Sequence, residues 1–386
     1  MRTAFISTYP PRRCGIATFS QALGVACGER VVVALQPVDQ ELPYPFEVAQ
    51  RIRRDEVADY TRVAAILNER VDAVSIQHDF EIWGGDDGSY VFDLIGALDV
   101  PAVATLHVVP AEPTARQRAT LTQLMDSVAA TVVMCQPAAT LLAGAYGADT
   151  RRVEVIHHGV PELPLVDSAT IKPTLGLVGR EVILTYGLLS PQKGVERALE
   201  AMPAVVADHP NVVYVVLGAT HPALVRDGGE AYRETLVERA KTLGLADHVR
   251  FIDRFAGRVE LTRWLEAADV FLTPYPTRDQ AVSGALSYAM GAGRAVVSTP
   301  FAYASDLLAD GRGVLLQDET PAALAAALTG LLGDPERRAA IGQRAYEHSR
   351  HMLWPHIGAT YNRLFTRVAA EGATAPSSAP LRIAHA

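Results

Sequence analysis

Cysteine and positive charge are both in short supply in this sequence. Its 386 residues include three cysteines, Cys14, Cys27 and Cys135, without the even number or the close spacing of a disulfide framework or a zinc site. Lys and Arg number 35 against 43 Asp and Glu, and the resulting net charge of −8 argues against a broad basic surface for nucleic acid. We therefore expect a cytoplasmic protein that binds no nucleic acid.

Long apolar runs are also missing. No stretch reaches the roughly 18 to 20 residues that a membrane-spanning helix needs. The first residues, MRTAFISTYPPRRCG, have neither the apolar length nor the cleavage pattern of a signal peptide. The first strand is not followed by the dinucleotide fingerprint G-x-G-x-x-G. We expect no integral membrane segment, and peripheral membrane contact stays open.

Short apolar runs alternate with helical patterns through most of the chain, which is typical of doubly wound α/β domains. A proline-rich segment at residues 161–180 interrupts the alternation and reads as a linker. We predict two Rossmann-like domains, at residues 1–165 and 175–350, and a disordered tail at 369–386. The predicted strands, continuously apolar as buried parallel strands are, are TAFIST, RVVVALQ, DAVSIQH, PAVATLH, ATVVMC and VEVIHHG, then EVILTYG, VVYVVLG, VRFID, VFLTPY and AVVST.

Open α/β sheets bind ligands beyond the carboxyl ends of their strands, so the loops there are the first places to look for a site. In the first domain, Gly15 opens a helix whose free amides can meet an anion, although a plain tight turn explains it equally well. His78 and His107 end consecutive strands, and Asp79 and Glu81 follow the first of them. Capped strand ends are the simpler alternative, but two histidines beside two acids favour a site.

In the second domain, Lys193 and Gly194 precede a helix, a pattern that suits a phosphate but is weak alone. Gly218 and Arg254 follow two further strands. Asp279 follows the strand VFLTPY, where its carboxylate can accept hydrogen bonds from vicinal hydroxyls. The small residues of the next predicted helix, residues 284–291, either let a ligand approach the backbone or let the helix pack closely on the sheet.

Several motifs in chain order, VIHHGV, YGLLSPQKG, AMGAGRAVVST and HMLWPHIGATYNRLF, resemble the family 4 retaining glycosyltransferases (glycosyl transferases group 1). The resemblance covers nearly the whole chain and implies the GT-B fold, two Rossmann-like domains facing across a cleft. It implies that the first domain takes the acceptor and the second the nucleotide-sugar donor. It also implies that a helix at about residues 352–368 crosses back to complete the first domain.

Carried over residue by residue, the resemblance is uneven. The family's phosphate-binding lysine matches Lys193, but its partner arginine falls on Leu188. The family's two glutamates, eight positions apart, fall on Asp279 and Ser287, so the second carboxylate of a degenerate donor motif is lost. A neighbouring arginine, Arg254 or Arg278, is a hypothetical source of the missing charge. Asp279→Ala is expected to abolish transfer without unfolding the protein.

The resemblance implies transfer of a hexose, with mannose or glucose as the guess, from a nucleoside-diphosphate sugar to a hydroxyl acceptor. Configuration is retained, and neither a metal nor another cofactor is required. We assign the catalytic contacts to His107, Lys193 and Asp279, and the acceptor contacts to His78 and Glu81. The donor is expected to contact Gly15, Gly187, Gly194, Gly218, Arg254, Val282, Ser283, Gly284 and Ser287.

Two alternatives remain open at this point. The losses at Leu188 and Ser287 are also what a phosphorylase-like GT-B enzyme would show, one that uses a sugar 1-phosphate and orthophosphate. A sugar- or nucleotide-binding protein without turnover is the other alternative. Turnover of a sugar 1-phosphate, compared with that of nucleoside-diphosphate sugars, separates the first from a transferase, and binding without any turnover identifies the second.

Overall fold

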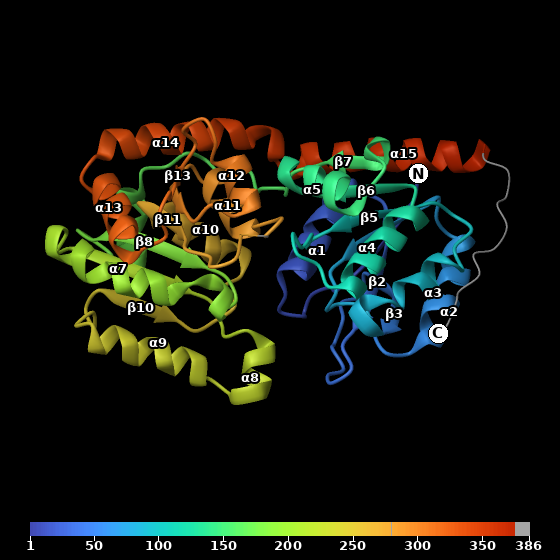
Figure 1. The fold of residues 1–386 in the computed structure, drawn as a ribbon, viewed down its shortest axis with the longest axis horizontal. Coiled ribbons are helices and arrows are strands. Elements are labelled where there is room, and N and C mark those ends of the chain that lie inside the picture. The colour runs from blue at the N-terminus through green and yellow to red at the C-terminus, as the bar shows by residue number, and fades with distance from the viewer. Residues whose placement is uncertain (279, 375–386) are drawn as a thin grey trace. The chain divides into compact units, whose positions relative to one another are not determined.

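The computed structural model describes residues 1–278 and 280–374, and the chain divides into two compact units. Unit 1 comprises Met1–Gly159 and Trp354–Ala386, and unit 2 comprises Val160–Leu353. Each unit has its own parallel β-sheet (Figure 1). The two units divide between Gly159 and Val160, and the domain boundary predicted at residue 165 stays a prediction.

Unit 1 contains a seven-stranded parallel sheet in the order β3-β2-β1-β4-β5-β6-β7. Its strands are β1 (Thr3–Ser7), β2 (Arg30–Gln36), β3 (Val48–Arg53), β4 (Ala73–His78), β5 (Ala102–Leu106), β6 (Ala130–Val133) and β7 (Val153–Val155). Its helices are α1 (Gly15–Cys27), α2 (Val57–Asn68), α3 (Val91–Ile95), α4 (Ala115–Ser127), α5 (Gln136–Tyr146) and α15 (Trp354–Thr374), with short 3-10 turns at Asp86–Gly88 and Thr150–Arg152. The strand order reverses between β1 and β4, and this topological switch point is where such sheets bind ligands.

The sequence pattern missed two strands, namely the two-residue β13 of unit 2 (Val314–Leu315) and, in unit 1, β3. Strand β3 lies at the edge of the sheet, and its residues alternate between exposed and partly buried positions. An edge strand is covered less than a central one, so VAQRIR lacks the continuous apolar run that marked β1, β4 and β5.

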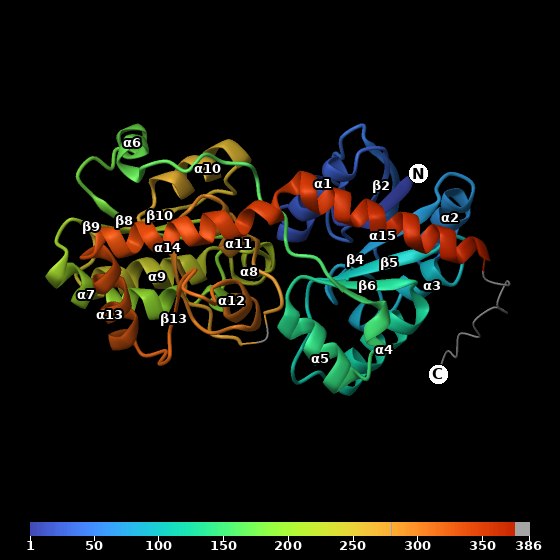
Figure 2. The ribbon, with the colours of Figure 1, turned by 90° about the horizontal axis from the view of Figure 1, so that it is seen from above.

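The C-terminal helix α15 packs on unit 1 beside α1, far from it in sequence (Figure 2). The two helices approach so closely that a Cβ at Gly358 would lie 2.3 Å from the carbonyl oxygen of Ala26. Because α15 continues through Thr374, the predicted disordered tail begins too early: residues 369–374 are helical. Ala-Ala-Glu there favours continuing a helix already packed through Val368, which is 1% exposed. Residues 375–386 lie outside the described residues.

Unit 2 contains a six-stranded parallel sheet in the order β10-β9-β8-β11-β12-β13, with its switch point between β8 and β11. Its strands are β8 (Glu181–Tyr186), β9 (Val212–Leu217), β10 (Val249–Ile252), β11 (Val270–Thr273), β12 (Ala295–Ser298) and β13 (Val314–Leu315). Its helices are α6 (Ser168–Ile171), α7 (Val195–Asp208), α8 (Pro222–Gly228), α9 (Ala231–Thr242), α10 (Arg258–Ala267), α11 (Gly284–Gly291), α12 (Ala302–Leu307), α13 (Pro321–Leu332) and α14 (Pro335–His348), with 3-10 turns at Lys172–Leu175, Pro191–Lys193 and Ser349–Met352.

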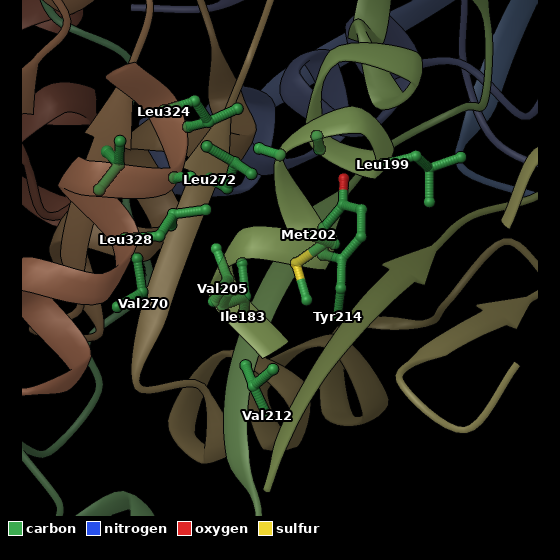
Figure 3. Packing of buried hydrophobic residues seen from close by; sticks show 14 of the residues in the cluster. Ile183, Leu199, Met202, Val205, Val212, Tyr214, Val270, Leu272, Leu324 and Leu328 are labelled. Carbon is green, nitrogen blue, oxygen red and sulfur yellow. The ribbon is translucent and has the colours of Figure 1, made fainter. Parts of the chain in front are cut away.

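The main core of unit 2 lies between its sheet and the helices α7, α9 and α13 (Figure 3). Side chains from β8, β9 and β11, such as Ile183 and Leu272, interdigitate with Met202 and Val205 of α7 and with Leu328 of α13. This buried layer holds the strands in place, so the loops at their carboxyl ends start from fixed positions.

The predicted linker at residues 161–180 is only partly right. Residues 168–175 form α6 and a 3-10 turn, and two of their side chains bind Asp269 in unit 2. The distances from Ser168 Oγ and Lys172 Nζ to the carboxylate are 2.7 and 2.6 Å. The Lys172–Asp269 pair is largely buried. The segment is therefore a folded part of unit 2, which the proline count concealed.

Candidate functional site

Three glycines bring the strand-end loops of unit 2 into direct contact at its switch point. A Cβ at Gly218, after β9, would lie 1.8 Å from the carbonyl oxygen of Gly187, after β8. A Cβ at Gly194, whose φ is 63°, would lie 1.9 Å from the carbonyl oxygen of Pro274, after β11. Real side chains cannot fit at these distances, so the loops require glycine here. All three glycines were predicted as donor contacts.

Lys193 lies in this region with its ammonium over an aromatic ring. Lys193 Nζ is 4.5 Å from the ring centroid of Tyr275 and 3.4 Å from its hydroxyl oxygen. Tyr275 is 1% exposed and stacks on Phe301 with ring centroids 5.1 Å apart. A cation–π interaction with this buried ring thus holds the Lys193 ammonium near the carboxyl ends of β8 and β11. Sequence reasoning missed Tyr275, which is part of the VFLTPY run.

The start of α11 lies beside the same tyrosine. Ser283 caps the helix by accepting a hydrogen bond from the amide of Leu286 at 3.3 Å, and its Oγ is 3.5 Å from the Tyr275 hydroxyl. Gly284 is the first helical residue, and the Val282 carbonyl accepts a hydrogen bond from Gln280. The predicted helix at residues 284–291 thus has the predicted bounds.

Two further predicted donor contacts in this segment, Asp279 and Ser287, gain no support from the structure. Asp279 lies outside the described residues, so its role remains a sequence prediction. Ser287 is fully buried: its hydroxyl donates to the Ser283 carbonyl at 3.0 Å and is 2.7 Å from the Tyr303 hydroxyl. Its side chain has no exposed surface, because Tyr303 and Ser283 enclose the position where the resemblance expected a carboxylate.

The two arginines suggested as replacements for the missing charge are both paired. Arg254 Nη2 lies 2.5 Å from Glu260 Oε1, and Arg278 Nη2 lies 2.9 Å from Glu319 Oε1, which are exposed ion pairs. Each guanidinium is thus paired with a glutamate in this structure, and the role of Arg254 as a donor contact remains a prediction.

A third arginine, Arg233 of α9, is buried at the carboxyl ends of β9 and β10. Its Nη2 donates to the Gly218 carbonyl at 2.6 Å and lies 2.8 Å from Asp253 Oδ1. Its Nη1 is buried without a hydrogen-bond partner among the described residues. Arg233 thus connects the Gly218 loop to the end of β10. No local sequence signal identifies it, because an arginine on a mostly polar helix is normally predicted to be exposed.

In unit 1, two predicted histidines are buried at the ends of β4 and β5. His107 Nε2 donates to Gln77 Oε1 at 2.9 Å, and Phe19 packs edge-on against the ring at 5.0 Å. Burial, and then the neighbouring His158 and His78, lower the pKa of His107 to about 3. Burial lowers the pKa of His78 to about 4. Both imidazoles are therefore neutral near pH 7.

His78 has an unusual feature for a fully buried side chain. Both ring nitrogens lack a hydrogen-bond partner among the described residues, although buried polar groups are nearly always paired. The same holds for Nη1 of Arg12, in the loop after β1. Arg12 acts electrostatically on Asp79, the residue after His78, whose pKa burial raises. These unpaired groups lie on the two loops that flank the unit 1 switch point.

The other two predicted residues of unit 1 are accessible. Glu81 is exposed, and its amide donates to Asp79 Oδ1 at 2.9 Å. Gly15 begins α1, and a Cβ at this position would meet no atom within 4 Å, so packing does not demand glycine there. The structure thus brings His78, Glu81 and Gly15 to one edge of the unit 1 sheet, and Lys193, Ser283 and the three glycines to the corresponding edge of unit 2.

Neither a metal cluster nor a membrane-spanning helix occurs in the described part of the chain. Over residues 1–278 and 280–374, no three His, Cys, Asp or Glu side chains are placed to share a metal ion. In the same residues, no helix combines the length and the apolar character needed to cross a bilayer.

Residues 167–348 match the family model described as glycosyl transferases group 1. Among curated relatives, a D-inositol 3-phosphate glycosyltransferase 2 of Catenulispora acidiphila is 29% identical over 265 residues, 66% of this chain and 60% of the relative. A phosphatidyl-myo-inositol mannosyltransferase of Mycolicibacterium smegmatis is 29% identical over 50% of this chain and 47% of the relative. The alignments thus span about half of the relatives' length.

Solved structures of glycosyltransferases show the same fold. Anabaena HepE in complex with UDP and glucose superposes with a TM-score of 0.76 at 15% identity, covering 95% of this chain and all of that one. Sucrose-phosphate synthase from Thermosynechococcus elongatus gives 0.79 at 15% identity, covering 96% of this chain and all of that one. At this identity the likeness establishes the fold, which is GT-B, as the sequence predicted.

Proposed function

We propose that this chain, whose residues 167–348 belong to the group 1 glycosyl transferases, transfers a hexose from a nucleoside-diphosphate sugar to a hydroxyl group of an acceptor. We propose further that configuration at the sugar is retained and that no metal takes part. The observation that carries the proposal is the position of Lys193. Its ammonium lies over the ring of Tyr275, beside the glycines that let the loops at the unit 2 switch point pack closely.

The donor diphosphate suits this arrangement chemically. A bound diphosphate needs cationic and N–H donors, and Lys193 offers an ammonium while the start of α11 offers backbone amides. As the bond between the sugar and the diphosphate breaks, negative charge grows on the leaving phosphate oxygen. A lysine already in place stabilises that charge without reorganisation, which is the main source of catalysis we propose.

The histidines of unit 1 fit orientation better than proton transfer. With the pKa of His107 lowered to about 3, its imidazole is a weak base near pH 7. We propose that His107 orients the transferred sugar through hydrogen bonds. The acceptor hydroxyl then loses its proton to the departing phosphate oxygen as the new glycosidic bond forms, so no protein base is needed.

The acceptor is proposed to bind at the unit 1 switch point. His78 offers two unpaired nitrogens, one donor and one acceptor when neutral, and a hydroxyl group pairs with both kinds of atom. Glu81 is the second proposed contact. Two relatives are named for D-inositol 3-phosphate and phosphatidyl-myo-inositol, which makes a polyol acceptor the first class to try.

A donor screen tests the proposal. Thermal unfolding is measured with UDP, GDP, ADP and their glucose and mannose conjugates, because a ligand that binds only the folded state raises apparent stability. Nucleotide release with polyol acceptors then reports transfer. Lys193→Ala should weaken donor binding about ten- to a hundredfold, the usual loss for one charged hydrogen bond. Lys241→Ala is the matched control, since Lys241 is exposed and pairs with Glu238. A wild-type protein that binds none of these nucleotides would refute the proposal.

Phosphorolysis is the second candidate, and the enclosed Ser287 favours it. Because its hydroxyl is used by Ser283 and Tyr303, this position has no carboxylate or exposed hydroxyl for a nucleoside. Phosphate-dependent turnover of glucose or mannose 1-phosphate, without turnover of nucleotide sugars, would replace the transferase proposal by this one.

A further inference from the structure

Unit 1 contains a pocket away from its switch point, at the carboxyl ends of the edge strand β3 and its neighbour β2. We call it the edge pocket. It lies between residues 36–41, which follow β2, and residues 51–62, from the end of β3 into α2. Its volume is about 660 Å³, within the range of roughly 300 to 1,000 Å³ that small-molecule sites occupy.

The lining of the edge pocket is charged but balanced. Four arginines line it, namely Arg51, Arg53, Arg54 and Arg62, together with four carboxylates, Glu41, Asp55, Glu56 and Asp59. The pocket therefore has no net charge to attract an anion such as a phosphate ester. It presents guanidinium donors and carboxylate acceptors side by side, which is the combination that the hydroxyl groups of an uncharged sugar can satisfy.

Three of the four arginines that line the pocket, Arg53, Arg54 and Arg62, already contact carboxylates of the same lining. Asp59 accepts a hydrogen bond from Arg53 Nε at 2.8 Å and from Arg62 Nη2 at 3.3 Å, and these contacts hold the pKa of its carboxyl well below the usual range. Arg54 Nε lies 3.3 Å from Asp55 Oδ1. A phosphate would have to displace these carboxylates, whereas a hydroxyl can bind alongside them.

Two lining atoms lack the hydrogen bonds that their burial demands. Gln36 is 7% exposed, and its Oε1 has no partner among the described residues, while its amide nitrogen donates to the Gln40 carbonyl. Arg54 Nε, despite its ion pair with Asp55, is likewise buried without a hydrogen bond among the described residues. One is an acceptor and the other a donor. Hydroxyl groups of a ligand satisfy both, because each hydroxyl donates once and accepts as well.

The edge pocket is tied to the proposed acceptor loop after β4. The hydroxyl of Tyr60 donates to the Arg54 carbonyl at 2.6 Å and accepts from the Gly84 amide at 3.1 Å. A Cβ at Gly84 would lie 2.0 Å from that carbonyl oxygen, so only glycine allows the loop to pack there. Arg54, which lines the pocket, therefore packs directly on the loop that carries Glu81.

We propose that the edge pocket binds an uncharged carbohydrate portion of the acceptor, and this inference rests on the proposed transferase function. It extends the acceptor site beyond the hydroxyl that reacts, with Gln36 and Arg54 as its first hydrogen-bonding contacts. The ligand class is a neutral, polyhydroxylated sugar chain rather than a sugar phosphate.

Binding is measured without donor, so the result does not depend on transfer. Saturation-transfer NMR is recorded with trehalose, maltotriose and α-mannotriose as neutral probes, and with inorganic phosphate and glucose 6-phosphate as anionic probes. Val38→Trp places a large side chain in the pocket from a position that is 64% exposed. Val25→Trp is the matched control, because Val25 is 60% exposed on α1 and lies outside the pocket.

We expect a neutral probe to bind the wild-type protein and Val25→Trp alike, and to bind Val38→Trp at least about tenfold more weakly, which is about 1.4 kcal/mol. Glu56→Gln, which removes one negative charge and leaves the pocket lining with a net charge of +1, should leave that affinity within about twofold. Binding of the phosphates alone, neutral binding that Val38→Trp does not change, or no binding of any neutral probe would each overturn the inference. Nucleotide binding by the same samples reports separately on the transferase proposal.

Discussion

The ammonium of Lys193 lies over the ring of Tyr275, 4.5 Å from its centroid, although the two residues are 82 positions apart. One residue follows β8 and the other follows β11, the two strands that flank the unit 2 switch point. A lysine side chain is flexible and well hydrated, so a fixed aromatic face reduces what it loses when it binds an anion. Tyr275 is therefore a positioning residue for Lys193.

The hydroxyl and the ring of Tyr275 can be tested separately. Tyr275→Phe keeps the ring under Lys193 and removes the hydroxyl near Ser283, so donor affinity should fall about two- to tenfold, as for one neutral hydrogen bond. Tyr275→Leu should weaken it further. The measurement is titration with the nucleotide sugar found in the donor screen. Tyr346→Phe, which removes a hydroxyl bonded to the Leu163 carbonyl, is the control and should leave donor affinity unchanged. Equal affinities for the two Phe variants would rule out a role of the hydroxyl, and a Tyr275→Leu variant that binds the donor as tightly as Tyr346→Phe would count against Tyr275 as a positioning residue.

Glycine at position 218 should be required for both fold and donor binding. In Gly218→Ala the new methyl would meet the Gly187 carbonyl at 1.8 Å, which forces the loops after β8 and β9 apart. We expect a loss of about 1 to 3 kcal/mol in the free energy of unfolding, as for other overpacked sites, and weaker donor binding. Gly144→Ala, in α5 with nothing within 4 Å, should be neutral or slightly stabilising. Urea unfolding of both variants is the measurement, and a Gly218→Ala protein as stable as Gly144→Ala would contradict the prediction.

His78 should show a trade between stability and activity. His78→Met removes two unpaired buried nitrogens and puts an apolar side chain in their place, so the free energy of unfolding should rise by about 1 kcal/mol. Transfer should fall because the proposed acceptor contact is lost. Gln77→Met provides the contrast, since Gln77 is bonded to His107 and Ser75 and its loss should destabilise the protein. If His78→Met lowered the free energy of unfolding as much as Gln77→Met, the His78 nitrogens would contribute to stability. A role in acceptor binding would then not be needed to explain why His78 is retained.

The buried histidines predict acid sensitivity in a defined range. Burial lowers the pKa of His78 and of His158 to about 4, and that of His107 to about 3. Below pH 6.5 the unfolded chain takes up protons that the folded imidazoles refuse, so the free energy of unfolding falls as the pH drops. The loss is about 1.4 kcal/mol per pH unit for each histidine, between about pH 6.5 and pH 4.

Urea unfolding at pH 7, 6 and 5 checks this dependence. His107→Gln removes one of the three titrating groups, so its stability should fall less steeply with pH than that of the wild-type protein, whatever its stability at pH 7. Identical slopes for the two proteins would contradict the assignment of a buried, neutral His107.

Much of the fold could be predicted from the sequence because parallel strands that are buried on both faces have continuous apolar sequences. That pattern located β1, β4 and β5, and β8 to β12, and it failed at β3, whose edge position permits polar residues. The glycines at 187, 194 and 218 were visible as strand-end glycines. Only the structure shows why glycine stands at each position. A Cβ at Gly194 or Gly218 would lie within about 2 Å of a carbonyl oxygen, and a Cβ at Gly187 would contact Lys193.

The sequence by itself determined the two α/β domains, their described strands other than β3 and β13, and the placement of Lys193, His78 and His107 at strand ends. Only the tertiary structure decided that Tyr275 lies under Lys193, that Tyr303 encloses Ser287, and that Arg233 is buried. The edge pocket belongs to this second group, since its two walls come from segments on either side of β3. The physical reason is the same in each case: local patterns encode which face of an element is buried, whereas the partner that buries it comes from a distant part of the chain.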